Sequence, residues 1–118
     1  MPSRSPRGGH PRRDAAYLND MREACAKIIG RTNRRKLTDL VSDEEFRDGV
    51  VLQLIYLGEA ASHLTEETKR SYPQAAWREI IGLRHLLVHK YWVIDHLKIW
   101  EYVQTDVPAL LEILFTLC

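Results

Sequence analysis

Apolar residues in the middle of this chain recur at steps of four and three, the spacing that returns to one side of a helix with 3.6 residues per turn. They form the stripe Phe46, Val50, Leu54, Leu57, Ala61 and Leu64. Val51 and Ile55 widen it, so this helix is expected to be heavily buried. No segment alternates apolar and polar residues over the length of a strand. The pattern therefore predicts an all-α protein.

The first half of the chain offers two helix starts. Asp14 can cap a helix that would stop at Gly30, and Ser42 can form a capping box with Glu45 at the start of the next. The first helix carries the apolar stripe Tyr17, Met21, Ala24, Cys25 and Ile28. The loop between the two helices is basic, with Arg31, Arg34, Arg35 and Lys36. A solvated loop is the preferred interpretation of this cluster, and an RNA contact is the alternative.

The second half contains three more helix signals. Thr65 is expected to cap a short helix that ends before Pro73, a third long helix begins near residues 74–77, and Asp95 caps the fourth. The third helix carries Ile80, Ile81, Leu83, Leu87 and Val88, and the fourth turns Leu97, Trp100, Val103, Val107, Leu110, Leu111 and Leu114 inward. Pro108 predicts a kink or break near residues 105–106.

Four amphipathic helices joined by short links predict an up-and-down four-helix bundle, with a short extra helix and a kinked last helix. Gly58, Ala60 and Ala61 would let a neighbouring helix approach the second long helix closely. The length of 118 residues suits one domain. We expect a disordered basic tail at residues 1–13 and a helical domain at residues 14–118.

Charge is unevenly distributed along the chain. Four of the 17 Lys and Arg residues precede Asp14, which leaves 13 basic against 16 acidic residues in the expected domain. A slightly acidic domain is not built to coat nucleic acid, although it can still hold a short RNA. No apolar run reaches the roughly 18–20 residues of a membrane span, and the basic N-terminus lacks the apolar core of a secretory signal. We expect a cytoplasmic protein in which Cys25 and Cys118 are reduced.

The chemistry lies in residues 77–92, where an otherwise apolar helix carries Arg84, His85 and His89, followed by Tyr91. A buried arginine without a partner is strongly disfavoured, so Arg84 should reach a groove or pair with a carboxylate. Glu59 is the expected partner, because it too lies on a heavily apolar helix.

From the residues alone, three interpretations of His85 and His89 remain open. They can be surface or satisfied core residues. They can bind a metal, since they are four apart on one helix face, but a third ligand such as His63 or His96 would be needed. Finally, histidine can exchange the protons of a ribose 2′-OH and a leaving 5′-oxygen, while Arg84 neutralises phosphate.

A set of motifs resembles the HepT branch of the HEPN superfamily. The pattern R-x-x-x-x-H is formed by Arg84 and His89, and H-x-Y extends it to Tyr91. Around it stand L-G-E-A-A at residues 57–61, W-x-x-I-I-G-L-R at 77–84 and I-W…D-V-P-x-L at 99–110. The residue after the arginine is commonly Asn in that branch, whereas here it is His85, which remains polar.

This resemblance implies a HEPN-like helical bundle that forms homodimers and cleaves RNA in a shared cleft without metal or cofactor. His89 would be the acid/base residue and Arg84 the phosphate anchor. His85 would be an auxiliary polar group, and Glu59 would support the site.

The resemblance also implies a partner. HepT-like toxins of type II toxin–antitoxin pairs are commonly encoded beside a minimal nucleotidyltransferase antitoxin, which in some cases adenylylates the tyrosine of H-x-Y. Tyr91 would be that target. The alternative function is a HEPN binding or regulatory subunit of a nucleotidyltransferase, without cleavage of its own.

Overall fold

Helices account for most of residues 11–116, the part of the chain that the computed structural model describes. The helices are α1 (Pro11–Thr32), α2 (Leu37–Ser42), α3 (Glu44–Ser62), α4 (Glu66–Ser71), α5 (Trp77–His89), α6 (His96–Glu101) and α7 (Val107–Thr116). A 3₁₀ turn, η1 (Tyr91–Val93), follows α5, and a π-helical turn, η2 (Tyr102–Asp106), joins α6 to α7. No strand occurs within this range. The predicted all-α class is confirmed.

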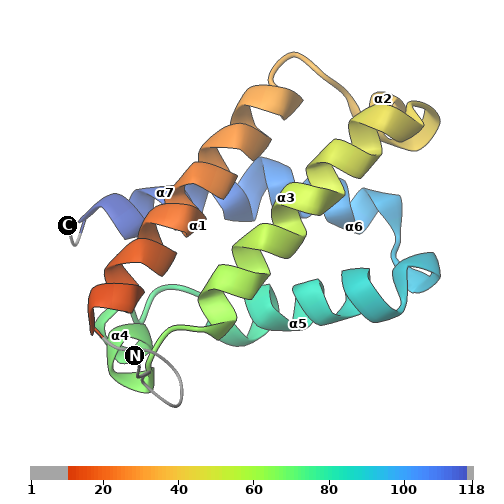
Figure 1. Cartoon of the computed structure of the whole chain (residues 1–118). Coiled ribbons are helices and arrows are strands. Elements are labelled where there is room, and N and C mark those ends of the chain that lie inside the picture. The colour runs from red at the N-terminus through yellow and green to blue at the C-terminus, as the bar shows by residue number, and fades with distance from the viewer. Residues whose placement is uncertain (1–10, 117–118) are drawn as a thin grey trace.

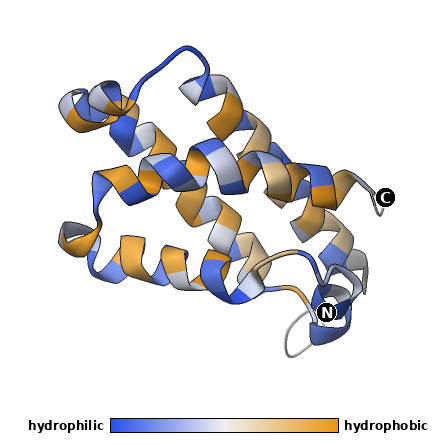
Figure 2. Ribbon diagram, turned by 180° about the vertical axis from the view of Figure 1, so that it is seen from behind, coloured by the Kyte–Doolittle hydropathy of each residue, from blue (hydrophilic) through white to orange (hydrophobic). Residues whose placement is uncertain are grey.

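The helix α3 lies at the centre of the contacts, with α1 packed along one side and α5 along the other (Figure 1). The segment from α6 to α7 crosses behind α1 and α3 and packs against α1. Apolar residues recur at each turn of the long helices, which is how each helix contributes to a shared core (Figure 2). Fully buried side chains include Met21, Ile28, Leu54, Leu57, Ile99, Val103, Val107 and Leu114, and α5 adds the buried Ile80 and Leu87. The predicted four-helix bundle is therefore confirmed.

The start of α1 differs from the prediction. The helix begins at Pro11, so Asp14 lies inside it rather than capping it, and the last three residues of the predicted tail are helical. Residues 1–10 of that tail lie outside the described range. Asp14 is only 3% exposed, and its carboxylate accepts hydrogen bonds from the backbone N–H and the hydroxyl of Thr65. A carboxylate predicted to begin α1 instead ties α1 to the start of α4.

The connection between α1 and α3 also contains features that the sequence pattern did not predict. Gly30 does not end α1, which continues to Thr32, and the backbone reverses through Arg34 at a φ of 64°. The additional helix α2 then precedes α3. Its buried Leu40 anchors it to the core.

The N-cap of α3 is Asp43, and the predicted capping box at Ser42 is wrong. The carboxylate of Asp43 accepts a hydrogen bond of 3.1 Å from the N–H of Phe46. Ser42 belongs to the last turn of α2, where its hydroxyl donates to the carbonyl of Thr38. Because the Ser42 hydroxyl is already hydrogen-bonded within α2, it does not cap α3.

Three predictions for the second half hold and one fails. Thr65 caps α4 and Asp95 caps α6, as expected. The predicted irregularity before Pro108 is the π turn η2, a wider turn that accommodates a residue without an N–H to donate. Leu97, expected to face inward, is 45% exposed, because α6 buries Ile99, which lies two residues on and about 200° around the helix. Within residues 11–116, no helix combines the length and apolar character that crossing a bilayer requires.

Candidate active site

The candidate site lies where α5 crosses α3, and a glycine sets the distance between these helices. Gly58 is buried, and a Cβ added to it would collide with the Cβ of Arg84 and lie 3.0 Å from the carbonyl oxygen of Ile80. The missing side chain thus gives Arg84 its place against α3. The close approach predicted for this part of the sequence is confirmed for Gly58.

Arg84 is anchored at this crossing by Glu59. Its Nη2 lies 2.7 Å from Oε1 of Glu59, which confirms the predicted pair. The Arg84 side chain is 30% exposed, while its Nε–H is buried without a hydrogen-bond partner within residues 11–116. One edge of the guanidinium is therefore held by the protein, and its solvent-facing part can receive an anion.

Glu59 extends this contact across α3 to α1. Its second carboxylate oxygen lies 3.0 Å from Nε2 of His63. The imidazole of His63 stacks on the ring of Tyr17, with centroids 4.9 Å apart and planes inclined by 16°. The series Arg84, Glu59, His63 and Tyr17 joins the three neighbouring helices α5, α3 and α1.

His85 and His89 are exposed and lie one turn apart at the end of α5. Their ring centroids are 4.6 Å apart. The third ligand required by the metal interpretation is not assembled: nowhere in residues 11–116 do three His, Cys, Asp or Glu side chains come together as a metal site. His63, one of the two residues considered for it, is bound to Glu59 instead.

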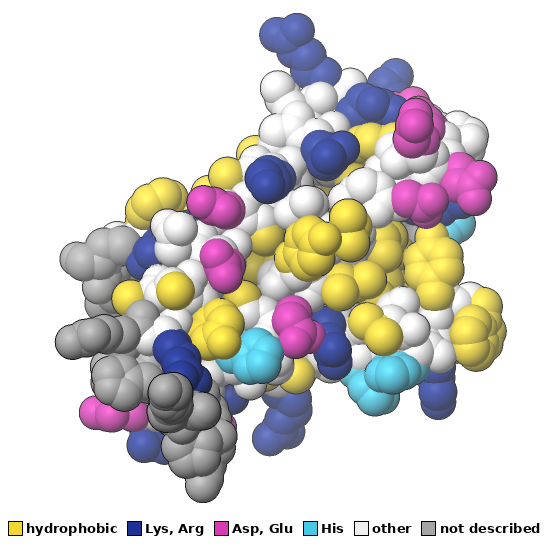
Figure 3. All heavy atoms as spheres, viewed as in Figure 1, with side chains coloured by type: hydrophobic (Ala, Val, Ile, Leu, Met, Phe, Trp, Pro, Cys, Tyr) yellow, Lys and Arg dark blue, Asp and Glu magenta, His cyan; other side chains and the backbone are white. Residues whose placement is uncertain are grey.

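Five residues of α-helix turn a side chain by about 140°, so Arg84 and His89 leave α5 in different directions. Arg84 faces α3, whereas His89 faces solvent at the end of the helix. In Figure 3, acidic, basic and histidine side chains gather over α3 and α5, with hydrophobic side chains beside them. Arg84, His85 and His89 thus lie on one region of the surface, but within one chain the side chains of Arg84 and His89 do not point toward each other.

Tyr91 is half-buried in η1, immediately after the histidines. Its hydroxyl accepts a hydrogen bond of 3.0 Å from Nε of Arg47. The Nη1 of Arg47 donates to the carbonyls of Leu40 and Val41 at the end of α2. Arg47 therefore holds the Tyr91 hydroxyl and satisfies helix-end carbonyls at once. Our sequence interpretation missed this residue, because the end of α2 was not predicted.

Within the basic cluster before α2, Arg35 supports the fold, while Arg31, Arg34 and Lys36 are exposed. The guanidinium of Arg35 lies 3.9 Å from the ring centroid of Phe46 and forms ion pairs with Asp39 and Asp43.

Comparison with known proteins places the chain in a family. The model of the family described as "Ribonuclease HepT-like" matches residues 21–117, which include every candidate site residue. No solved structure matches the chain significantly.

Named relatives agree with this match. A protein of Thermococcus cleftensis named "Probable ribonuclease HepT" is 32% identical over 94 residues, which cover 80% of this chain and 86% of the relative. A "Putative RNase" of Methanocaldococcus jannaschii is 31% identical, with 80% of this chain and 87% of the relative covered. The chain belongs to the ribonuclease HepT-like family.

Proposed function

We propose that the chain is a ribonuclease that acts in the cytoplasm as the toxin of a toxin–antitoxin pair. The observation that carries this proposal is the Arg84–Glu59 ion pair, partly exposed beside two exposed histidines in a chain of the ribonuclease HepT-like family. Within the pair, the guanidinium of Arg84 keeps its positive charge and its solvent-facing part can bind phosphate, and the imidazole side chains can exchange protons.

In the proposed reaction, neutral His89 removes the proton of a ribose 2′-OH. The 2′-oxygen forms a bond to phosphorus, the bond from phosphorus to the 5′-oxygen breaks, and a protonated histidine gives that oxygen its proton. The products are a 2′,3′-cyclic phosphate and a 5′-hydroxyl. Arg84 neutralises the charge that builds on the phosphoryl oxygens. Side chains thus supply both proton transfer and charge neutralisation, so the mechanism requires no metal ion.

A homodimer would complete this site. One chain directs Arg84 and His89 apart, whereas a two-fold contact repeats every residue and can bring His89 of each copy to one groove. Trp92, 81% exposed beside the histidines, and the exposed Val88 are apolar and suit such a contact. Sedimentation should show a dimer, and Trp92→Asp should give a folded monomer without activity. A fully active wild-type monomer would contradict this arrangement.

The proposed antitoxin is a minimal nucleotidyltransferase that transfers AMP to Tyr91. The half-buried hydroxyl is held beside the guanidinium of Arg47, which can pair with the new phosphate once AMP is attached. The adduct would add bulk and negative charge near His89, and both oppose binding of RNA.

The decisive experiment compares cleavage by wild type and by His89→Ala, with His96→Ala as a control histidine outside the proposed site. Loss of acid/base catalysis should reduce cleavage by about 10²–10⁴-fold without changing thermal stability. A substrate with 2′-deoxyribose at the cleaved position should resist wild type, and EDTA should have no effect.

Cleavage of the deoxy substrate at the normal rate would overturn 2′-OH attack. If a purified wild-type dimer cuts no RNA yet binds a nucleotidyltransferase, the alternative of a binding or regulatory subunit replaces the proposal.

A further inference from the structure

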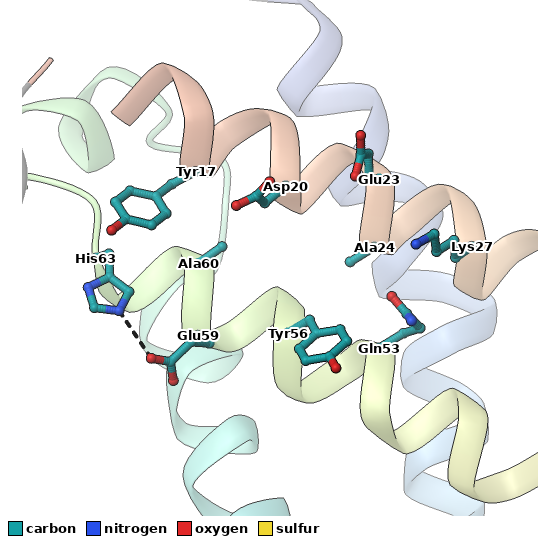
Figure 4. A pocket seen from close by; sticks show the side chains of 10 residues that line it. All are labelled: Tyr17, Asp20, Glu23, Ala24, Lys27, Gln53, Tyr56, Glu59, Ala60 and His63. Atoms are coloured by element: carbon teal, nitrogen blue, oxygen red, sulfur yellow. Dashed lines mark hydrogen bonds and ion pairs between the residues drawn. The ribbon is translucent and has the colours of Figure 1, made fainter. Parts of the chain in front are cut away.

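A pocket of about 300 Å³ lies between α1 and α3, next to Glu59 (Figure 4). Asp20 and Lys27 line it from α1, and Gln53, Tyr56 and Glu59 line it from α3. Asp20 and Gln53 reach into the space between the two helices (Figure 4). The pocket therefore combines hydrogen-bonding groups of both kinds with aromatic surface.

Gln53 is the unusual residue of this pocket. The residue is only 7% exposed, and its amide, which has no hydrogen-bond partner within residues 11–116, faces the open pocket. A polar group at the wall of a pocket that has no protein partner forms its hydrogen bonds with water or with a ligand. The Gln53 amide offers an N–H donor beside a carbonyl acceptor, aimed into an open pocket. This arrangement fits a ligand whose edge carries an acceptor beside a donor.

Cytosine and adenine both have such an edge, and adenine, with two rings, offers the larger face for stacking. The 6-amino group of adenine donates and the adjacent ring nitrogen accepts, the pair that a glutamine amide binds with two hydrogen bonds. The carboxylate of Asp20 can accept from the second hydrogen of the amino group. The ring of Tyr56, 53% exposed at the pocket, offers a face on which a base can stack.

The position of the pocket links it to the candidate site. Gln53, Tyr56 and Glu59 follow one another at steps of three along one side of α3, so about 9 Å of helix separates the first from the last. Glu59 also holds Arg84, the proposed phosphate anchor, at 2.7 Å. An RNA strand whose phosphate lies on Arg84 can therefore place a neighbouring base in the pocket.

We infer that the pocket between α1 and α3 binds the adenine base of a nucleotide adjoining the scissile phosphate. This inference rests on the proposed ribonuclease function, since it identifies the base that the same site prefers. The free nucleotide AMP carries the same adenine base and could bind the same pocket. The experiments below distinguish binding of free AMP from binding of RNA.

The cleavage test uses RNA oligonucleotides that differ only at the nucleotides flanking the cleaved bond. Wild type should prefer adenine at one flanking position by about tenfold or more in KM. Replacing that adenine by purine, which lacks the 6-amino group, should remove the preference. Two variants test the pocket: Gln53→Leu, which keeps a similar volume, and Asp20→Asn, which changes an exposed residue. Each should raise KM for the adenine substrate. Neither should change kcat, or the KM for substrates with another base. Gln104→Leu, an exposed glutamine outside the pocket, is the matched control.

A binding test with uncleavable 2′-deoxy oligonucleotides keeps the inference separate from the proposed function. If no RNA is cut, the ribonuclease proposal fails, but adenine-dependent binding lost in Gln53→Leu and Asp20→Asn still supports the pocket. Equal cleavage and equal binding of all four bases would overturn the inference. Gln53-dependent binding of AMP without any base preference in RNA would also overturn it, because the pocket would then serve a free nucleotide.

Discussion

Arg84 lies against α3 because residue 58 is a glycine: a Cβ on Gly58 would collide with the Cβ of Arg84 and crowd the backbone of α5. The position of Arg84, the proposed phosphate anchor, thus depends on residue 58 having no side chain. The same contact places Arg84 beside Glu59.

Gly58→Ala should therefore separate α5 from α3 at the site. Overpacking of this kind costs about 1–3 kcal/mol, and the shift of Arg84 should lower cleavage further than the stability loss explains. Gly82→Ala is the control, because a Cβ there meets nothing within 4 Å. It should keep full activity and raise the free energy of unfolding by up to about 1 kcal/mol. Both variants should be compared by urea unfolding and by cleavage assays. If the two variants behaved alike, Gly58 would not determine the position of Arg84.

Glu59→Gln should reduce cleavage more than stability. The ion pair is partly exposed, so its loss should lower the free energy of unfolding by about 1 kcal/mol or less. Arg84, however, loses the charge that orients its guanidinium, and KM for RNA should rise. Glu66→Gln removes an exposed carboxylate that pairs with Lys69 at 3.2 Å and should change neither. Unchanged kinetics in Glu59→Gln would show that Arg84 is positioned by packing alone.

Tyr91→Phe should stay toxic yet escape inactivation by the proposed nucleotidyltransferase, since it keeps the ring but removes the oxygen that accepts AMP. Mass spectrometry after co-expression should show AMP adducts on wild type and on Tyr56→Phe, and none on Tyr91→Phe. Neutralisation of all three without a mass change would mean that control occurs by binding alone.

Asp43 should make the stability of the fold depend on pH. The hydrogen bond from the N–H of Phe46, followed by the contact with Arg35, lowers the pKa of this carboxyl below its usual value. A lowered folded-state pKa stabilises the fold above the unfolded-state pKa, and this contribution disappears as pH falls through the folded-state value. Asp43→Asn, which keeps a capping side chain, should be less stable than wild type near neutral pH. Urea unfolding should show the difference shrinking as the pH falls through the lowered folded-state pKa of Asp43, and a constant difference would contradict the assignment.

Cys25 should be chemically silent in the folded protein. Burial raises the pKa of its thiol to about 12, so the reactive thiolate is almost absent at neutral pH. In a Cys118→Ser variant, a thiol reagent such as DTNB should therefore label the protein only after denaturation. Rapid labelling of the native variant would show that the core around Cys25 opens readily.

Most of the helices and one side-chain pair of the site could be predicted from the sequence. The core positions of α3 follow from steps of four and three, and Thr65 and Asp95 stand directly before the helices they cap. The pairing of Arg84 with Glu59 followed from a different argument, because a charge on a core-forming helix needs a partner and few carboxylates lie on such helices.

Other contacts depend on residues far apart in the chain. Asp14 was expected to cap α1, but it binds Thr65, 51 residues away, and Arg47 reaches Tyr91 over 44 residues. A side chain that could bind several partners forms its hydrogen bond with the one that packing brings within reach. No local pattern distinguishes between those partners.

The sequence by itself determined that the chain is helical, where most helices run, and which residues are candidates for the site, because helical periodicity and the functional group of each side chain can be read locally. Only the tertiary structure decided that Gly58 admits Arg84, that Arg47 holds Tyr91 and that Gln53 faces a pocket without a partner. These relationships depend on the distance and rotation of α3 relative to α1 and α5. Those quantities are set by the packing of the whole core rather than by any one helix.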